Sequence, residues 1–310
     1  MSAPPDATTE PTGSSAGAPV DPAAETRWRL PRWAWLIVAL VVVAVLAFIP
    51  GGVKEQFSVA QEFELKPIVE LPKIGPLDVS INKAVIYLWL TVGIIVVAAL
   101  VTSRVLKTVP GRFQFAMETL YVLARDGIVG SVMKQGRERW FPYIAGVFVF
   151  VLTCNLIGLV PLPFGERHQL GFYTATANLF VTATLALFTF AFTHYAGIRQ
   201  KGALRYVRSW APASAPPVLK QLIWGIHAIS ELFRLVSLAV RLFANMLAGH
   251  AILGVFFAMA LIFQNYLTAA LLQGGSVAIY LFEIFVAFIQ AFIFAILSAV
   301  YIGGALEEAH

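Results

Sequence analysis

Long apolar runs with few charges are the feature that most restricts how this chain can fold. A helix that crosses a bilayer needs roughly 20 mostly apolar residues. Only 13% of the residues are charged, against about 25% in a soluble domain, and mean hydropathy is +0.78. These runs predict an all-α integral membrane protein with about six membrane helices. They cover approximately residues 33–50, 84–101, 141–161, 174–196, 222–263 and 276–302.

The N-terminal region differs in composition from the rest of the chain. Residues 1–32 begin with a stretch rich in Pro, Ala, Ser, Thr and Gly and end in a basic segment, so we predict a disordered extension. Residues 33–50 are either an extra membrane helix or a signal sequence. A retained helix is favoured, because 26 mostly polar residues precede the basic stretch. Residues 51–310 form the main membrane domain, and prolines at 67, 72 and 76 are expected to break regular structure near its start.

Basic residues indicate the topology. They concentrate in residues 1–32, 102–140 and 197–221, which the positive-inside rule places in the cytoplasm. Residues 51–82 and 162–173 then lie outside. The net charge of +5 therefore reflects membrane orientation, and no nucleic-acid partner is implied. Helical spacing of apolar residues over 112–133 predicts an amphipathic helix on the membrane surface.

The last third of the chain predicts two unusually long helices. The run 222–263 contains no proline and would be about 63 Å long as one helix. The hydrocarbon core is only about 30 Å thick, so this helix must tilt strongly or break, with Gly249 and Gly254 as candidate bends. A turn at 273–275 would join it to the final run, giving a strongly tilted hairpin.

Six ionisable residues interrupt these two runs. A charge at the bilayer centre costs about 2.5–3.5 kcal/mol on insertion scales. His227, Glu231 and Arg234 lie near the expected cytoplasmic end, where snorkelling to the interface and a functional role are both open. Arg241 lies about 20 residues into the run, where snorkelling explains it poorly. The remaining two are His250 and Glu283.

Helical geometry separates these residues into two faces. Positions 227, 234 and 241 share one face, with Asn245 one turn beyond, whereas His250 points the opposite way. A hairpin would pair His250 with Glu283, and both groups are able to exchange protons near neutral pH when their environment suits. Arginine stays charged, so Arg241 acts as a gate that needs a moving carboxylate on a partner.

Other classes of function find less support in the sequence. Cys154, the one cysteine, is interpreted as a packing residue. We find no metal-ligand cluster, nucleophile motif or phosphate loop, so we expect no catalysis by this chain and no cofactor or metal. A proton-coupled secondary transporter remains the alternative, although that class usually shows internal repeats and broken helices.

Several motifs carry a resemblance to a known family. The segment SLAVRLFANMLAGH from Ser237 to His250 and the ending from Glu283 to Tyr301 closely resemble subunit a, the stator of the rotary F-type ATP synthase membrane sector. So do Lys66-Pro67, Val109-Pro110-Gly111-Arg112 and the run from Asn155 to Pro161. The resemblance covers about residues 63–308.

This resemblance implies a function and partners. Arg241 would be the essential arginine facing a ring of c subunits with mid-membrane carboxylates, with Gln290 near it and Asn245 along the polar path. His250 and Glu283 would line a half-channel from the outside. Arg234, Glu231 and His227 would lie beside a cytoplasmic half-channel. Asn155 would either line a channel or pack helices.

The resemblance also implies a setting. The chain would be a multi-pass protein of a bacterial plasma (inner) membrane rather than a mitochondrial one, held by b-type peripheral stalk subunits, with ATP chemistry elsewhere. In two respects it departs from many bacterial members. His250 and Glu283 are exchanged, and the acid usually found at position 227 stands one turn later, at Glu231.

Overall fold

The computed structural model describes residues 67–70, 80–160, 173–212, 216–262 and 266–307. Five helices in these ranges are long and apolar enough to cross a membrane. The predicted all-α membrane fold is therefore confirmed. The predicted extension 1–32 and the predicted N-terminal span, 33–50, lie outside the described residues. The five helices are α3 (Lys83–Val105), α6 (Arg137–Gly158), α7 (Leu179–Lys201), α9 (Pro217–Ile262) and α10 (Tyr266–Leu306).

Shorter elements connect these helices. The expectation of no regular structure around Pro67 is wrong, because Pro67 begins strand β1 (Pro67–Val69), which pairs antiparallel with β2 (Ile81–Asn82). Proline is tolerated at the first residue of a strand. The other short elements are α4 (Arg112–Val122), the π-helical η1 (Leu123–Val129), α5 (Gly130–Val132), the 3-10 turn η2 (Ala175–Ala177) and α8 (Ala203–Arg208).

Local sequence sets the ends of the spanning helices. Asn82 and Asn178 stand just before α3 and α7, and their side chains accept hydrogen bonds from the backbone N–H groups of Val85 (3.1 Å) and Phe180 (2.8 Å). Such caps satisfy donors that the first helical turn leaves free. Helix α7 ends at Gly202, whose φ of 80° favours glycine.

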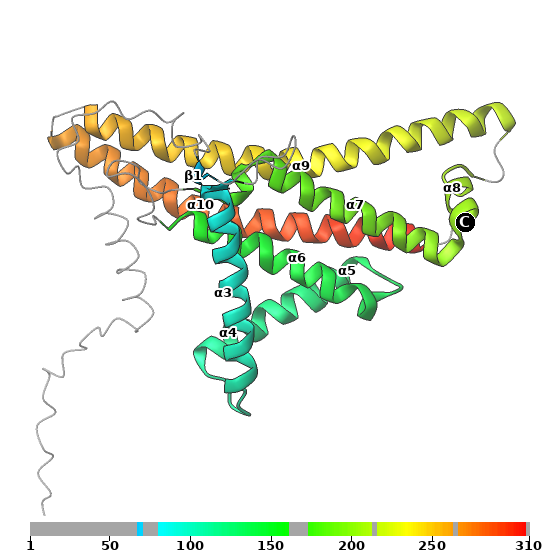
Figure 1. Ribbon diagram of the computed structural model, residues 1–310, viewed down its shortest axis with the longest axis horizontal. Helices are drawn as coiled ribbons and strands as arrows, with labels where there is room; N and C mark the ends of the chain where they lie inside the picture. Colours follow the sequence, from blue (N-terminus) through cyan, green and yellow to red (C-terminus); the bar gives the residue numbers. More distant parts are fainter. Residues whose placement is uncertain (1–66, 71–79, 161–172, 213–215, 263–265, 308–310) are drawn as a thin grey trace, which may run out of the picture. The chain divides into compact units, whose positions relative to one another are not determined.

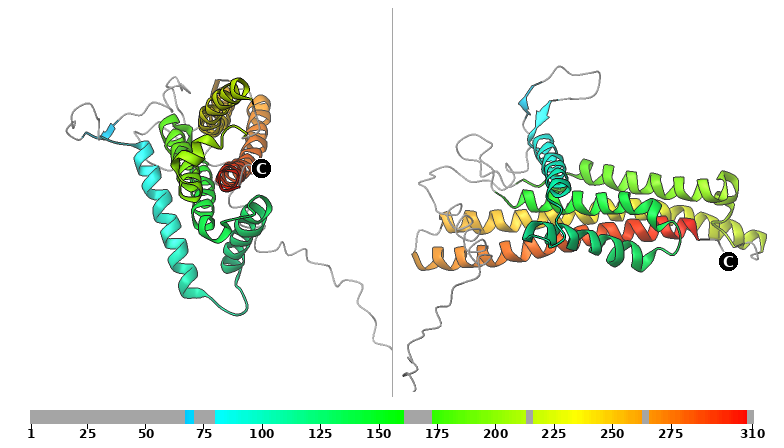
Figure 2. Two further views of the ribbon diagram at one scale, coloured as in Figure 1. Left: turned by 90° about the vertical axis from the view of Figure 1, so that its right-hand side faces the viewer. Right: turned by 90° about the horizontal axis from the view of Figure 1, so that it is seen from below.

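The long C-terminal hairpin is present, and α9 and α10 run side by side in all views (Figures 1 and 2). Helix α9 has 46 residues and α10 has 41, or about 69 and 62 Å. Helix α9 continues through Gly249 and Gly254 without a break. A tilt is therefore needed to fit a 30 Å core, and α3 runs across the direction of the hairpin (Figures 1 and 2).

The predicted turn at 273–275 is wrong. Gln273, Gly274 and Gly275 lie inside α10, and the two helices are joined through residues 263–265. A Cβ on Gly275 would lie 3.0 Å from Cε1 of Phe256 on α9. Gly275 thus serves close packing between the helices, a use of glycine that membrane helices tolerate.

Helix α10 packs in the core between α6, α7 and α9. Four alanines at every fourth position, Ala287, Ala291, Ala295 and Ala299, are each 0% exposed. Small residues let membrane helices approach closely. Hydroxyl groups add a link between three helices, since Thr189 lies 2.9 Å from the Tyr143 hydroxyl and 3.3 Å from the Ser298 hydroxyl.

The predicted amphipathic helix is present as the consecutive segments α4, η1 and α5. Its apolar residues Ile128, Val129 and Met133 are all buried. Segment η1 contacts α6 and α10, so this face packs against protein, and a position on the membrane surface stays a prediction.

Candidate functional site

A buried ionisable pair joins the two long helices. His250 on α9 is 5% exposed and Glu283 on α10 is 3% exposed, and His250 Nδ1 lies 3.1 Å from Glu283 Oε1. A Cβ on Gly249 would lie 2.2 Å from the same Oε1. Gly249 therefore provides the space that Glu283 occupies. From the sequence, Gly249 was expected only as a candidate bend.

Both nitrogens of the His250 ring have oxygen partners. Nδ1 lies 3.0 Å from the Met246 carbonyl as well as next to Glu283. Nε2 lies 2.8 Å from the Thr174 hydroxyl and 3.2 Å from the Gly158 carbonyl. A Cβ at Gly158 would lie only 1.7 Å from the Thr174 hydroxyl oxygen. The absence of a side chain at Gly158 thus lets Thr174 reach the ring.

A shell of polar groups extends this buried cluster toward α6. Asn155 is 0% exposed; its Nδ2 donates to the Ala287 carbonyl (3.2 Å), and its Oδ1 accepts from the Thr176 hydroxyl (2.7 Å). Both proposed uses of Asn155, packing and path lining, are compatible with this position. Within the described ranges neither oxygen of Glu283 accepts a hydrogen bond, which leaves the contact with His250 as its partner. Burying such a pair costs free energy, and intramembrane ionisable groups commonly mark function.

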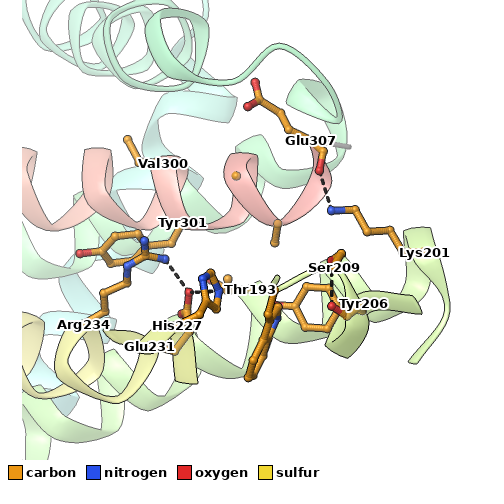
Figure 3. Close-up of a pocket in the computed structure, with 13 residues that line it drawn as sticks. Thr193, Lys201, Tyr206, Ser209, His227, Glu231, Arg234, Val300, Tyr301 and Glu307 are labelled. Atoms are coloured by element: carbon orange, nitrogen blue, oxygen red, sulfur yellow. Dashed lines mark hydrogen bonds and ion pairs between the residues drawn. The ribbon is translucent and has the colours of Figure 1, made fainter. Parts of the chain in front are cut away.

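A second ionisable cluster lies nearer the start of α9. Glu231 is 7% exposed, and its Oε1 lies 2.6 Å from Arg234 Nη1 and 3.3 Å from His227 Nε2. The Arg234 guanidinium also lies 5.2 Å from the ring centroid of Tyr301 on α10. The three ionisable residues line an open pocket of about 370 Å³ together with groups from α7, α8 and α10 (Figure 3).

This pocket has an aromatic wall beyond α8. The Trp210 ring lies 5.1 Å from the ring of His227 and stacks on Trp224 at 5.8 Å. Tyr206 projects into the same region (Figure 3). Burial, followed by the charge of Glu231, raises the pKa of the Tyr206 hydroxyl, because both disfavour the phenolate. The hydroxyl therefore stays protonated at neutral pH.

Contacts along the hairpin place Arg241 level with Gln290. Gly249 lies opposite Glu283, and the helices are antiparallel (Figure 1). Arg241 lies eight residues before Gly249 on α9, and Gln290 lies seven residues after Glu283 on α10. The approach of Gly275 to Phe256, about two turns away in the other direction, fits the same register.

Arg241 itself is on an exposed face of α9. In the part of the chain that the structure describes, it forms no ion pair with a carboxylate. Arg241 lies about 15 Å along the axis from Glu231 and about 13.5 Å from His250. It therefore separates two ionisable clusters that do not contact each other. Asn245, one turn beyond, is half-buried.

Some site residues escaped the sequence analysis. Thr174, Thr176 and Gly158 are uncharged, and only the fold brings them to His250. The sequence TATAN at 174–178, polar at alternate positions directly before an apolar run, was the one available indication. Tyr301 was recognised as part of a motif but not as a partner of Arg234. Among the described residues no group of three His, Cys, Asp or Glu is placed to hold a metal ion.

Comparison with known proteins identifies the family. The sequence profile of the ATP synthase A chain matches residues 85–303. ATP synthase subunit a of Rubrobacter xylanophilus is 43% identical over 242 residues, 77% of this chain and 90% of the relative. The chain belongs to the ATP synthase subunit a family. The same protein of Methylobacterium is 36% identical over 253 residues, 80% of this chain and 96% of the relative.

Family membership establishes the complex to which the chain belongs and the process in which it takes part. The chain is an integral component of the ATP synthase membrane sector and takes part in ATP synthesis and proton transport, and the chemistry of ATP takes place elsewhere in that complex. The alternative of a secondary transporter is no longer needed. The family places no residue in a role by itself, so the roles of the two clusters rest on their geometry.

Proposed function

We propose that this subunit is a proton-conducting stator, with two aqueous half-channels separated by Arg241. The observation that carries the proposal is the arrangement along α9. Two ionisable clusters lie on either side of an exposed arginine that has no carboxylate partner within the described chain. A fixed charge with an exposed face is suited to a partner that presents a carboxylate.

The inner surface of the first half-channel is formed by His250 and Glu283. By the positive-inside rule this end of α9 faces outside. Their ring nitrogen and carboxylate, 3.1 Å apart, are able to relay a proton that arrives through the polar groups around Thr174 and Asn155. The glycine at position 249 keeps the two groups in contact.

The second half-channel corresponds to the pocket around Glu231 (Figure 3). Its carboxylate receives a proton released by the partner, and Arg234 and His227 hold it in place. The pocket opens toward the segment 197–221, which the sequence places in the cytoplasm. A proton leaving here completes a passage that neither half-channel provides alone.

Arg241 couples the two halves without carrying protons. Its guanidinium keeps its charge at any physiological pH, so it attracts an ionised carboxylate of the c-subunit ring and repels a free proton that would leak straight across. Gln290, at the same level on α10, and Asn245 are positioned to hydrogen-bond this carboxylate. Ring rotation would then carry protons from one half-channel to the other.

The same proposal names the setting. The partners are the c-subunit ring and b-type peripheral stalk subunits. The membrane is a bacterial plasma (inner) membrane, in keeping with bacterial relatives such as those of Rubrobacter and Chlorobium.

ATP-driven acidification of inverted membrane vesicles tests the role of Arg241. Arg241→Ala should abolish acidification while the complex still assembles, because the variant no longer holds the partner carboxylate. Arg205→Ala on exposed α8 removes an arginine from the same chain and should leave acidification intact. Normal pumping by the Arg241 variant would refute the stator mechanism.

A further inference from the structure

A second pocket, of about 400 Å³, lies between the ends of α6, α7 and α10. It is separate from the two ionisable clusters described above. Arg139 is the third residue of α6 and Arg199 is the third from the end of α7. Both therefore lie where these spans leave the hydrocarbon, at the level of lipid headgroups. The lining residues are Gly136, Arg139, Trp140, Ala196, Arg199, Gln200 and Leu306.

The two guanidinium groups converge on this pocket without an acidic partner. Arg199 Nη1 donates to the Tyr195 hydroxyl at 2.8 Å, and both arginines interact electrostatically with that hydroxyl. Arg139 also lies 5.9 Å from the centroid of the Trp140 ring. Over the described ranges neither arginine forms an ion pair.

Two carboxylates close in sequence to the pocket residues are paired with other basic groups. Glu138 pairs with Arg125 at 3.2 Å, and Glu307 pairs with Lys134 at 3.5 Å. Lys201 Nζ donates to the Glu307 carbonyl at 2.5 Å. Neither acid lines the pocket, whose charged lining residues in the described chain are the two arginines.

The pocket is held in shape by contacts within the chain. Gln200 Nε2 donates to the Leu306 carbonyl and to Gln135 Oε1, both at 3.2 Å, which ties the end of α7 to the end of α10. The buried Trp140 ring forms one wall and meets the Phe192 ring edge-on at 5.9 Å. A ligand therefore meets a site that needs little rearrangement.

An apolar surface continues from the pocket along α7. Tyr195 and Phe188 are seven residues apart, so they share a face, and they are 48% and 55% exposed. On α6, Gly146 is seven residues from Arg139 and shares its face, and an added Cβ there would meet nothing within 4 Å. A ligand with a charged head in the pocket and apolar tails along the helices fits both parts.

We propose that this pocket binds the phosphate headgroup of an anionic phospholipid, such as phosphatidylglycerol, with its acyl chains lying against α6 and α7. Arginine suits a phosphodiester because its planar fork donates two parallel hydrogen bonds to phosphate oxygens. Basic pockets between membrane helices on the cytoplasmic side are a recognised type of lipid site. The bound lipid would link the ends of α6 and α7 at the surface.

Native mass spectrometry of the whole detergent-purified ATP synthase tests this proposal. After delipidation, phosphatidylglycerol or phosphatidylcholine is added back, and bound lipids are counted. The wild-type complex should retain one phosphatidylglycerol per copy of this chain in preference to phosphatidylcholine. Each basic residue near an anionic surface contributes about 1 kcal/mol, so Arg139→Gln with Arg199→Gln should weaken retention about 30-fold.

Two further variants separate a built site from general surface charge. Arg205→Gln with Arg208→Gln on α8 removes the same charge from exposed positions that do not line the pocket, and should leave retention unchanged. Arg139→Lys with Arg199→Lys keeps the charge but not the fork, so its affinity should be intermediate. Equal retention by both glutamine pairs, or equal loss, would overturn the proposal. Displacement of the lipid by millimolar inorganic phosphate would overturn it too, by assigning the pocket to free phosphate.

Discussion

Gly249→Ala gives the most direct test of the His250–Glu283 pair. The added Cβ would lie 2.2 Å from Glu283 Oε1 and 2.9 Å from its carboxyl carbon. An ordinary contact for a Cβ is 3.4 Å or more, so the carboxylate must retreat by more than 1 Å. Retreat lengthens the 3.1 Å contact between the Glu283 carboxylate and the His250 ring nitrogen. No charge is removed, so only the geometry of the relay changes.

Proton release through the proposed first half-channel, which opens to the lumen of inverted vesicles, should therefore slow markedly in this variant. The assay is ATP-driven acidification of inverted vesicles, normalised to the amount of assembled complex. Overpacking typically costs about 1–3 kcal/mol, so some loss of assembly is expected and the normalisation is essential. Glu283→Asp shortens the acid by one methylene and should restore part of the activity in the Gly249→Ala background.

Gly274→Ala is the matched control. Gly274 lies inside α10, and a Cβ there meets nothing within 4 Å, so pumping should stay normal. The reasoning is refuted if Gly249→Ala pumps as well as wild type per assembled complex. It is also refuted if the Gly274 variant is impaired to the same degree.

Removing either His250 or Glu283 should slow ATP-driven acidification of the same vesicles more than Glu231→Gln does, because the pair is the proposed relay, whereas Glu231 has Arg234 and His227 beside it. Equal, small effects would make the pair a packing contact. Gly197→Ala should lower the thermal stability of the purified complex by about 1–3 kcal/mol, since its Cβ would lie 2.2 Å from a neighbouring tyrosine ring. Gly146→Ala, with open space at its Cβ, serves as the neutral comparison in the same melting experiment.

The sequence predicted the spans because hydrophobic runs and basic loops act locally. It also placed His250 and Glu283 opposite each other, since a face of a helix follows from spacing alone once a hairpin is assumed. The membrane role followed from the chain's family motif around Arg241. Apart from the assumed hairpin, these successes concern properties that one helix, or one motif, contains by itself.

Glycine was the main source of error. A glycine favours a turn, a bend or a close approach, and the sequence around Gly249 and Gly274-Gly275 does not distinguish these uses. Only the neighbouring helix decides, through Glu283 in one case and Phe256 in another. Thr174 was missed for a related reason, because its contact with His250 spans 76 residues. Long-range polar contacts of uncharged residues leave no periodic pattern.

The alanine face of α10 has a mechanical consequence. In the proposed stator mechanism, this subunit has to resist the torque of a turning ring, and compliance in its helices would waste part of each step. Alanines at every fourth position, with no exposed surface, leave no side-chain rotamers to rearrange, and hydroxyl contacts from Tyr143 through Thr189 to Ser298 cross-brace three helices. Helix α10 would then be a rigid support for α9. A force applied at the exposed face of α9 would be transmitted to α6 and α7 with little deformation.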